Sequence, residues 1–189
     1  MSKAATAKAV FLDRDGTLNE EIDLLHRPED LRLLPGVGKA IARLNKLGYK
    51  VIVVTNQPVV ARGLCSEEKV REIHETLKKM VAQEGGKIDA IYYCPHSKLA
   101  EVQEYRIECD CRKPGTGLLK QAQKAHNLDL KASFMVGDMT RDLLAGRNAG
   151  CQTILVKTGY RGLDGQFDAK PDFVCVDLTE AAELIARQR

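Results

Sequence analysis

The chain has 189 residues, of which 44% are hydrophobic and 29% are charged, and its formal net charge is +3. This length and composition predict one globular domain, residues 1–189, with a well-buried core. The small net charge and the 5% aromatic content argue against a nucleic-acid partner. No apolar run reaches the roughly 18 residues of a membrane-spanning helix, so we expect no membrane partner either.

The N-terminal segment 1–8 is small and polar and lacks the apolar core of a signal peptide. We therefore expect a cytoplasmic protein, and we expect it to be a monomer. In that compartment the six cysteines favour metal-binding or structural roles over disulfides.

The first predicted strand, residues 10–12, runs directly into Asp13-Arg14-Asp15-Gly16-Thr17. In an open parallel α/β sheet, ligands bind outside the carboxyl ends of the strands. Two carboxylates placed there can hold Mg²⁺, and one can attack an electrophile while the other moves a proton. An inert, solvated turn is the alternative when this segment is taken alone.

A helix predicted over 36–47 ends at Gly48, and β-branched residues then predict a strand at 50–56. This strand ends in Thr55-Asn56-Gln57, whose hydroxyl and amide groups can donate hydrogen bonds to phosphoryl oxygens. Taken alone, a threonine at a strand end reflects only β-propensity. A second helix is predicted from Ser66, its N-cap, to about Glu84, and a third strand at 88–93.

The polar segment 94–111 carries three thiols and one imidazole, at Cys94, His96, Cys109 and Cys111. Three Cys and one His match a closed structural zinc site, and a zinc ion would order a loop that has no core of its own. The ligand pairs are more tightly spaced than Cys-x-x-Cys, and free cysteines beside a surface histidine are the alternative. Lys113 follows, a cation that could balance a phosphoryl group.

The remaining chain continues the alternation of strands and helices. The strand predicted at 133–138 ends in Gly137-Asp138, a carboxylate that could complete a Mg²⁺ site. Strands separated by helices predict a Rossmann-like, doubly wound α/β fold with a mainly parallel sheet and no large cap domain. Further helices are predicted over 117–127, 141–149 and 179–187, and further strands at 153–156 and 172–176.

The order of these motifs resembles that of the haloacid dehalogenase (HAD) superfamily over residues 10–142. The resemblance implies an HAD-like fold and a Mg²⁺-dependent phosphatase that works through an aspartyl-phosphate intermediate. It implies that Asp13 is the nucleophile and Asp15 the general acid and base. It further implies that the transferring phosphoryl group is stabilised by Thr55 and Lys113, and that Mg²⁺ is held by Asp13, the carbonyl of Asp15, and Asp138.

Cys-Pro-His at 94–96 and Cys-x-Cys-Arg-Lys-Pro at 109–114 resemble one HAD branch in particular, which contains heptose bisphosphate 7-phosphatases and histidinol-phosphate phosphatases. The long gap between the two half-sites is similar to the heptose group. This implies a sugar bisphosphate substrate, cleaved at the C7 phosphate of D-glycero-D-manno-heptose 1,7-bisphosphate. By the same resemblance, the substrate is contacted by Glu21, Ile22, Asp23, Leu24, Asn56, Gln57, Arg62 and Arg112.

Two other functions stay open from the sequence. Histidinol phosphate or another small phosphomonoester is the alternative substrate, and a catalytically idle, zinc-stabilised interaction module is the alternative outside the enzymes. The chain also departs from the branch at positions that face substrate: it has Pro58-Val59 in place of Ser-Gly, Met139 in place of Lys, and Asp23-Leu24 in place of Gly-Tyr. His74 has no partner pattern, and we expect a surface or helix role for it.

Overall fold

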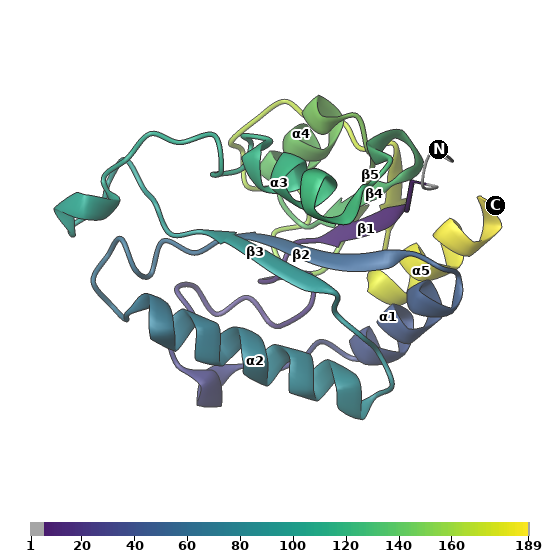
Figure 1. Ribbon diagram of the computed structural model, residues 1–189, viewed down its shortest axis with the longest axis horizontal. Coiled ribbons are helices and arrows are strands. Elements are labelled where there is room, and N and C mark those ends of the chain that lie inside the picture. The colour runs from purple at the N-terminus through teal and green to yellow at the C-terminus, as the bar shows by residue number, and fades with distance from the viewer. Residues whose placement is uncertain (1–5, 189) are drawn as a thin grey trace, which may run out of the picture.

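The computed structural model describes residues 6–188, so most of the polar N-terminal segment lies outside the described residues. In the described chain, six strands form one parallel sheet in the order β3-β2-β1-β4-β5-β6 (Figure 1). The strands are β1 (Ala9–Leu12), β2 (Lys50–Asn56), β3 (Ala90–Cys94), β4 (Phe134–Gly137), β5 (Gln152–Val156) and β6 (Phe173–Cys175).

Helices cover both faces of this sheet, with α1, α2 and α5 on one side and α3 and α4 on the other (Figure 1). The doubly wound, mainly parallel fold is therefore confirmed. The α-helices are α1 (Val37–Lys46), α2 (Glu67–Gln83), α3 (Gly117–His126), α4 (Thr140–Ala149) and α5 (Leu178–Arg187). Three short 3₁₀ helices join them: η1 (Pro28–Asp30), η2 (Gln103–Tyr105) and η3 (Leu130–Ala132).

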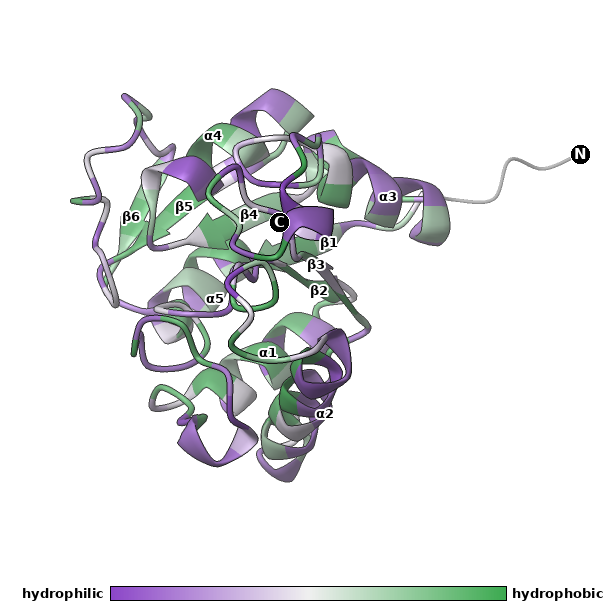
Figure 2. Cartoon of the chain, turned by 90° about the vertical axis from the view of Figure 1, so that its left-hand side faces the viewer, coloured by the Kyte–Doolittle hydropathy of each residue, from purple (hydrophilic) through white to green (hydrophobic). Residues whose placement is uncertain are grey.

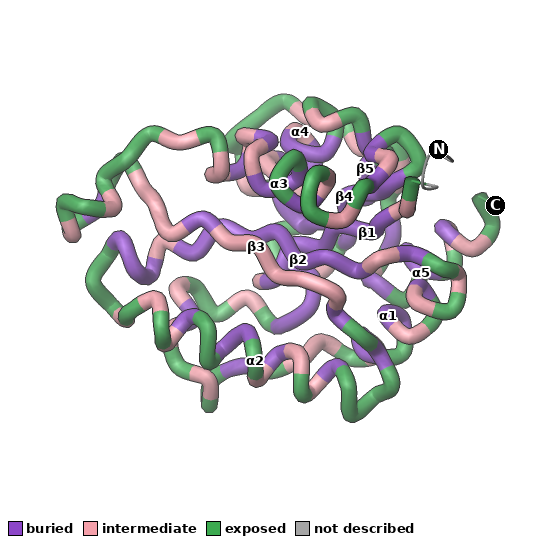
Figure 3. Tube along the Cα trace, in the orientation of Figure 1, coloured by how far each residue is buried: buried purple, intermediate pink, exposed green. Residues whose placement is uncertain are grey.

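The central strands are apolar at almost every position because both of their faces are covered. In β1, Val10 and Leu12 pack in the core shared with Ile41 of α1, whereas Phe11 packs on the opposite side against Leu119 of α3. Figure 2 shows these strands as hydrophobic, and Figure 3 shows them buried while the helices expose their outer faces. The sheet is thus the middle layer of three.

Local signals placed most element boundaries correctly. Gly48 adopts a left-handed φ of 81° after α1, and the Ser66 side chain caps α2 by accepting from the Lys69 N–H at 3.3 Å. The third strand was predicted two residues too early. At its start, the Asp89 carboxylate accepts a hydrogen bond from the Val51 N–H at 2.9 Å, in place of a backbone bond of the sheet. Strand β3 therefore begins at Ala90, and it ends at Cys94.

The topology fixes where a ligand can bind. Strand β1 lies between β2 and β4, so connections leave it in opposite directions, and a crevice forms at the carboxyl ends of β1 and β4. Strand ends, connecting segments and the first turn of α4 surround this crevice, and no large cap covers it in the described chain, as predicted. None of the described helices has the length and apolar character needed to cross a membrane.

Candidate active site

A cavity of about 300 Å³ opens at the carboxyl ends of the central strands. Most of the residues predicted to act on or bind a substrate line it together, although they come from distant parts of the chain. They are Asp13, Asp15, Glu21, Asp23, Leu24, Thr55, Asn56, Gln57, Arg62 and Arg112. Two predicted residues do not line the cavity: Lys113 is buried behind Asp13, and Ile22 is 44% exposed.

Asp13 lies at the cavity floor and is 3% exposed. Its Oδ1 accepts a hydrogen bond from the Arg14 backbone N–H at 2.7 Å and lies 2.8 Å from Lys113 Nζ. Lys113 is itself buried, lies 2.7 Å from Asp142 Oδ1, and donates to the Val54 carbonyl at 2.8 Å. Burial lowers the pKa of Lys113, but the charges of Asp13 and Asp142 outweigh it and raise the pKa. The floor therefore holds a fixed ammonium beside a carboxylate.

Asp15 is surrounded by donors. Its carboxylate accepts from Arg14, from Asn19 Nδ2 at 2.9 Å and from Gln57 Nε2 at 2.9 Å. Burial raises the pKa of Asp15, but the Arg14 charge and these hydrogen bonds outweigh it and hold the pKa below its ordinary value. The side chain remains 21% exposed, facing the cavity.

Three carboxylates, of Asp13, Asp138 and Asp142, offer oxygens within 4.8 Å of one another. Asp138 Oδ2 accepts from the Tyr160 N–H at 2.7 Å, whereas Oδ1 is buried without a partner. Burial raises the pKa of Asp138 to about 8, and the charges of Asp13 and Asp142 add to the shift. An oxygen-only donor set, an unpartnered buried oxygen and excess negative charge fit a hard divalent cation such as Mg²⁺.

Two close-packed glycines shape this metal cradle. Gly16 and Gly159 adopt left-handed φ values of 74° and 53°, and a Cβ at either position would collide with the Asp138 carboxylate. Asp142 was not predicted as a metal ligand. Its Oδ2 accepts a hydrogen bond from the Met139 N–H at 3.1 Å, at the start of α4. Sequence reasoning did not identify Gly159, because the segment after β5 has no pattern.

The amide side chains of Asn56 and Gln57 are already engaged. Asn56 bonds the Lys113 backbone twice, through Nδ2 to the carbonyl and Oδ1 from the N–H, both at 3.0 Å. Gln57 Nε2 donates to Thr55 Oγ1 at 2.9 Å as well as to Asp15. Both residues line the cavity, and in this structure their hydrogen bonds hold Lys113, Thr55 and Asp15 in place.

The cavity wall is divided by charge. Glu21 and Asp23 lie on the segment after β1, where burial and the charges of Asp15 and Asp13 raise the pKa of Glu21. On the other side, burial and then the charges of Arg141 and Arg62 lower the pKa of Arg112, whose Nη1 donates to the His96 carbonyl at 2.9 Å. The wall can therefore accept hydroxyl protons on one side and bind an anion on the other.

Sequence reasoning missed the wall that comes from the segment after β5. Tyr160, Asp164 and Gln166 line the cavity, and Asp164 fastens this segment by accepting from the N–H and hydroxyl of Thr140 at 2.8 and 2.7 Å. Arg141 was missed too, because a charged residue in the first turn of a helix is usually solvated. Its buried Nε has no partner.

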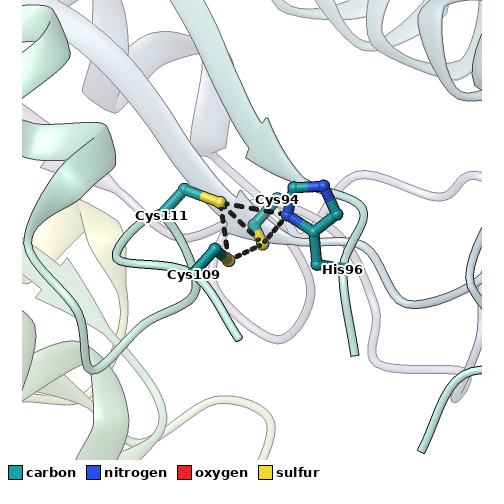
Figure 4. A group of neighbouring side chains, drawn as sticks. All are labelled: Cys94, His96, Cys109 and Cys111. Atoms are coloured by element: carbon teal, nitrogen blue, oxygen red, sulfur yellow. Dashed lines mark hydrogen bonds between the residues drawn. The ribbon is translucent and has the colours of Figure 1, made fainter. Parts of the chain in front are cut away.

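Cys94, His96, Cys109 and Cys111 converge beside the cavity, with their sulfur atoms and the imidazole Nδ1 pointing at one another (Figure 4). The separations run from 2.9 Å for Cys111–Cys109 to 3.8 Å for Cys94–His96, and every cysteine is free. Burial opposes ionisation of Cys109, but hydrogen bonds from Cys111, His96 and Cys94 lower its pKa to about 7. The group offers three sulfur atoms and one nitrogen atom within 4.8 Å of one another, a donor set that suits zinc.

Comparisons with known proteins agree with this geometry. A family model described as HAD-hydrolase-like matches residues 110–181. A heptose-1,7-bisphosphate 7-phosphatase of Thermosynechococcus vestitus is 43% identical over 185 residues, which cover 94% of each chain. A D-glycero-beta-D-manno-heptose-1,7-bisphosphate 7-phosphatase of Haemophilus ducreyi is 42% identical over 94% of this chain and 98% of its own.

A crystal structure resembles the whole fold. The D,D-heptose 1,7-bisphosphate phosphatase of B. bronchiseptica, complexed with magnesium and phosphate, superposes with a TM-score of 0.85 at 36% identity. The match covers 96% of this chain and 99% of that one. The similarity therefore extends over the sheet, the helices and the connecting segments that form the cavity.

Proposed function

The chain belongs to the HAD-like phosphatases, a family of phosphoric monoester hydrolases, and on that premise we propose that it removes the C7 phosphate of D-glycero-D-manno-heptose 1,7-bisphosphate. One observation carries the chemistry: Lys113 Nζ lies 2.8 Å from Asp13 at the floor of a cavity. A carboxylate that attacks an anionic phosphate needs its charge balanced, and a buried ammonium provides this.

In the proposed first step, an oxygen of Asp13 forms a bond to phosphorus as the bond from phosphorus to the sugar oxygen breaks. The buried floor holds Asp13 in a single position, between the Arg14 N–H and Lys113. Such positioning and charge neutralisation provide most of the catalysis in phosphoryl transfer. The product of this step is an acyl phosphate on Asp13 and a sugar hydroxyl.

Asp15 is proposed to move the protons. It gives a proton to the departing sugar oxygen, and it later takes one from the water that attacks the acyl phosphate and frees Asp13. The free protein holds Asp15 as a carboxylate, which is the form needed as a base. An incoming phosphate brings negative charge close to it and thereby favours the protonated form needed as an acid.

Mg²⁺ would be held by Asp13, the Asp15 carbonyl and Asp138, and it would supply charge neutralisation at the phosphoryl oxygens. The unpartnered Oδ1 of Asp138 supports this assignment. Thr55 faces the same cavity and would donate its hydroxyl to a phosphoryl oxygen, since its Oγ1 accepts from Gln57 and its proton is free to point elsewhere.

A structural zinc ion is part of the proposal. Cys94, His96, Cys109 and Cys111 would fill its four positions, leaving none for a substrate. Because Cys111 directly precedes Arg112 and Lys113, the ion would order the segment that delivers both cations to the cavity. Arg112, with Arg62 and Arg141 beside it, would bind the second phosphate of the substrate.

Phosphate release from a panel of sugar phosphates tests the proposed function. The panel contains the heptose 1,7-bisphosphate, its 1-phosphate, glucose 6-phosphate and histidinol phosphate, each assayed with Mg²⁺. We expect the highest kcat/KM for the bisphosphate and release of one phosphate per molecule. A preference for histidinol phosphate would contradict the proposed substrate but not the chemistry, and no turnover of any ester would contradict both.

A further inference from the structure

Arg14 separates the two aspartates of the first motif, yet its side chain turns away from the cavity and is fully buried. Its guanidinium holds the Asp15 carboxylate with Nε 3.0 Å from Oδ1 and Nη2 2.8 Å from each oxygen. A buried guanidinium is costly unless it is paired. Here the buried guanidinium lies directly behind Asp15, the residue proposed to move protons. Its position indicates that Arg14 has a role at the site.

The remaining nitrogen of this guanidinium reaches helix α2. Nη1 of Arg14 lies 3.4 Å from Nε2 of His74, which is 5% exposed. A guanidinium has only donors, so Nε2 is the acceptor and the ring proton sits on Nδ1. Burial and the Arg14 charge lower the pKa of His74 to about 3. The imidazole is therefore neutral at physiological pH and keeps the lone pair that this contact requires.

We infer that Arg14 and His74 are positioning residues that hold the Asp15 carboxylate in the orientation needed for proton transfer. This inference rests on the proposed role of Asp15. Asn19 and Gln57 also contact Asp15. Among the described side chains that bond Asp15, Arg14 alone is charged, and its guanidinium is linked to helix α2 by the contact to His74. Without His74, the guanidinium could rotate about its long side chain and carry Asp15 with it.

His74 is itself held firmly. The Tyr93 ring of β3 meets it edge to face, with ring centroids 5.3 Å apart and an interplanar angle of 64°. The Tyr93 hydroxyl donates to Glu67 at 2.6 Å, and the Tyr105 hydroxyl donates to the other oxygen of Glu67 at 3.0 Å. A chain of contacts thus runs from Asp15 to the start of α2. Its rigidity is what a positioning role needs.

The leaving group provides a test that a merely structural role would not pass. A sugar alkoxide needs a proton from Asp15 as it departs, whereas p-nitrophenolate leaves readily without one. For His74→Leu we expect kcat/KM to fall roughly tenfold with glucose 6-phosphate, mainly through kcat, and to change less than about threefold with p-nitrophenyl phosphate. Gln can accept a hydrogen bond, so His74→Gln should recover most of the loss.

Two further variants keep the test valid even if His74→Leu fails to fold. Arg14→Lys keeps the charge but loses the fork that reaches His74, and we expect the same selective loss with glucose 6-phosphate. His126→Leu is the matched control: this histidine lies on α3, 3.2 Å from the Tyr92 hydroxyl, and its loss should alter neither substrate. Thermal unfolding of each variant shows that the protein measured is folded.

Each outcome decides the inference. Selective loss with the sugar phosphate in His74→Leu or Arg14→Lys supports it. Equal losses in kcat/KM on both esters, or no loss in the folded variants, overturn it; kcat/KM is the quantity compared because the later attack of water on the acyl phosphate, common to both esters, does not enter it. Asp13→Asn separates this failure from failure of the proposed function: if that variant still turns over p-nitrophenyl phosphate, the Asp13 mechanism is wrong, whatever His74 does.

Discussion

Removing the charge of Asp138 should stabilise the metal-free protein at alkaline pH. The folded protein raises the pKa of this buried carboxyl from 3.8 to about 8, so the folded state binds a proton that the unfolded state has already lost. Stability must then fall as pH rises from about 4 to about 8. Asn resembles the protonated form, so Asp138→Asn should lack this dependence on pH.

The size of the effect follows from the same two pKa values. Each unit of pKa difference corresponds to about 1.4 kcal/mol. Between pH 5 and pH 8 the wild-type protein should lose about 4 kcal/mol of unfolding free energy through this group, and Asp138→Asn should not lose it. Below about pH 4, where the carboxyl is protonated in the unfolded state as well as in the folded state, the two proteins should be of similar stability.

Urea unfolding in EDTA, at pH 5 and pH 8, measures this difference. The exposed Asp168 offers a matched control, since Asp168→Asn removes a carboxylate without touching the cluster. Mg²⁺ should restore stability to the wild type at pH 8, because it binds only the folded state, and should do little for Asp138→Asn. Parallel pH profiles for wild type and Asp138→Asn would refute the reasoning.

Three other predictions follow from the site. Asp13→Asn should lower phosphate release by several orders of magnitude, because it removes the proposed nucleophile; near-normal steady-state release would contradict this. Elemental analysis of reduced, metal-replete protein should find one zinc per chain, lost in Cys109→Ser; a wild type without zinc would contradict the zinc site. Arg112→Ala should lower kcat/KM for a sugar bisphosphate about ten- to a hundredfold more than for a monophosphate, whereas Lys113→Ala should impair both alike; equal losses for Arg112→Ala would place Arg112 at the common phosphoryl site.

The sequence predicted the fold well because the signals for it are local. Uninterrupted apolar strands require cover on both faces, and glycine and serine at positions such as Gly48 and Ser66 mark helix ends. The error at β3 has the same origin. Asp89 mimics a ladder partner through its side chain, and a long-range hydrogen bond of this kind leaves no mark in a local pattern.

The cavity floor could be predicted for a topological reason. Parallel strands bring their carboxyl ends to one edge, so residues at strand ends, such as Asp13 and Thr55, meet whatever their separation in sequence. The network behind the floor could not be predicted this way. His74 contacts Arg14 across 60 positions of sequence, and nothing in the helical pattern around His74 distinguishes it from a histidine of the core.

The departures from the branch pattern gain meaning from their location. Pro58, Val59 and Met139 all line the cavity, as do Asp23 and Leu24, and none belongs to the floor that holds Asp13 and Lys113. Asp23 and Leu24 adopt left-handed φ values of 48° and 49°, a conformation that aspartate tolerates but that costs a leucine about 1 kcal/mol or more. The segment after β1 therefore has backbone angles that are typical of glycine at two positions where it has no glycine.

The charge of the cavity wall bears on the departure at Met139, where the resemblance leads us to expect a lysine. Met139 leaves the position after Asp138 uncharged, yet Arg141, two residues later, lines the same cavity. Its pKa is lowered by burial, but the neighbouring carboxylates, Asp142 foremost, outweigh this and raise it. A cation is thus available on that wall from a different position of α4. In the proposed function the floor carries out the reaction and the wall selects the ester, so we expect substitutions confined to the wall to change specificity while the phosphoryl chemistry persists.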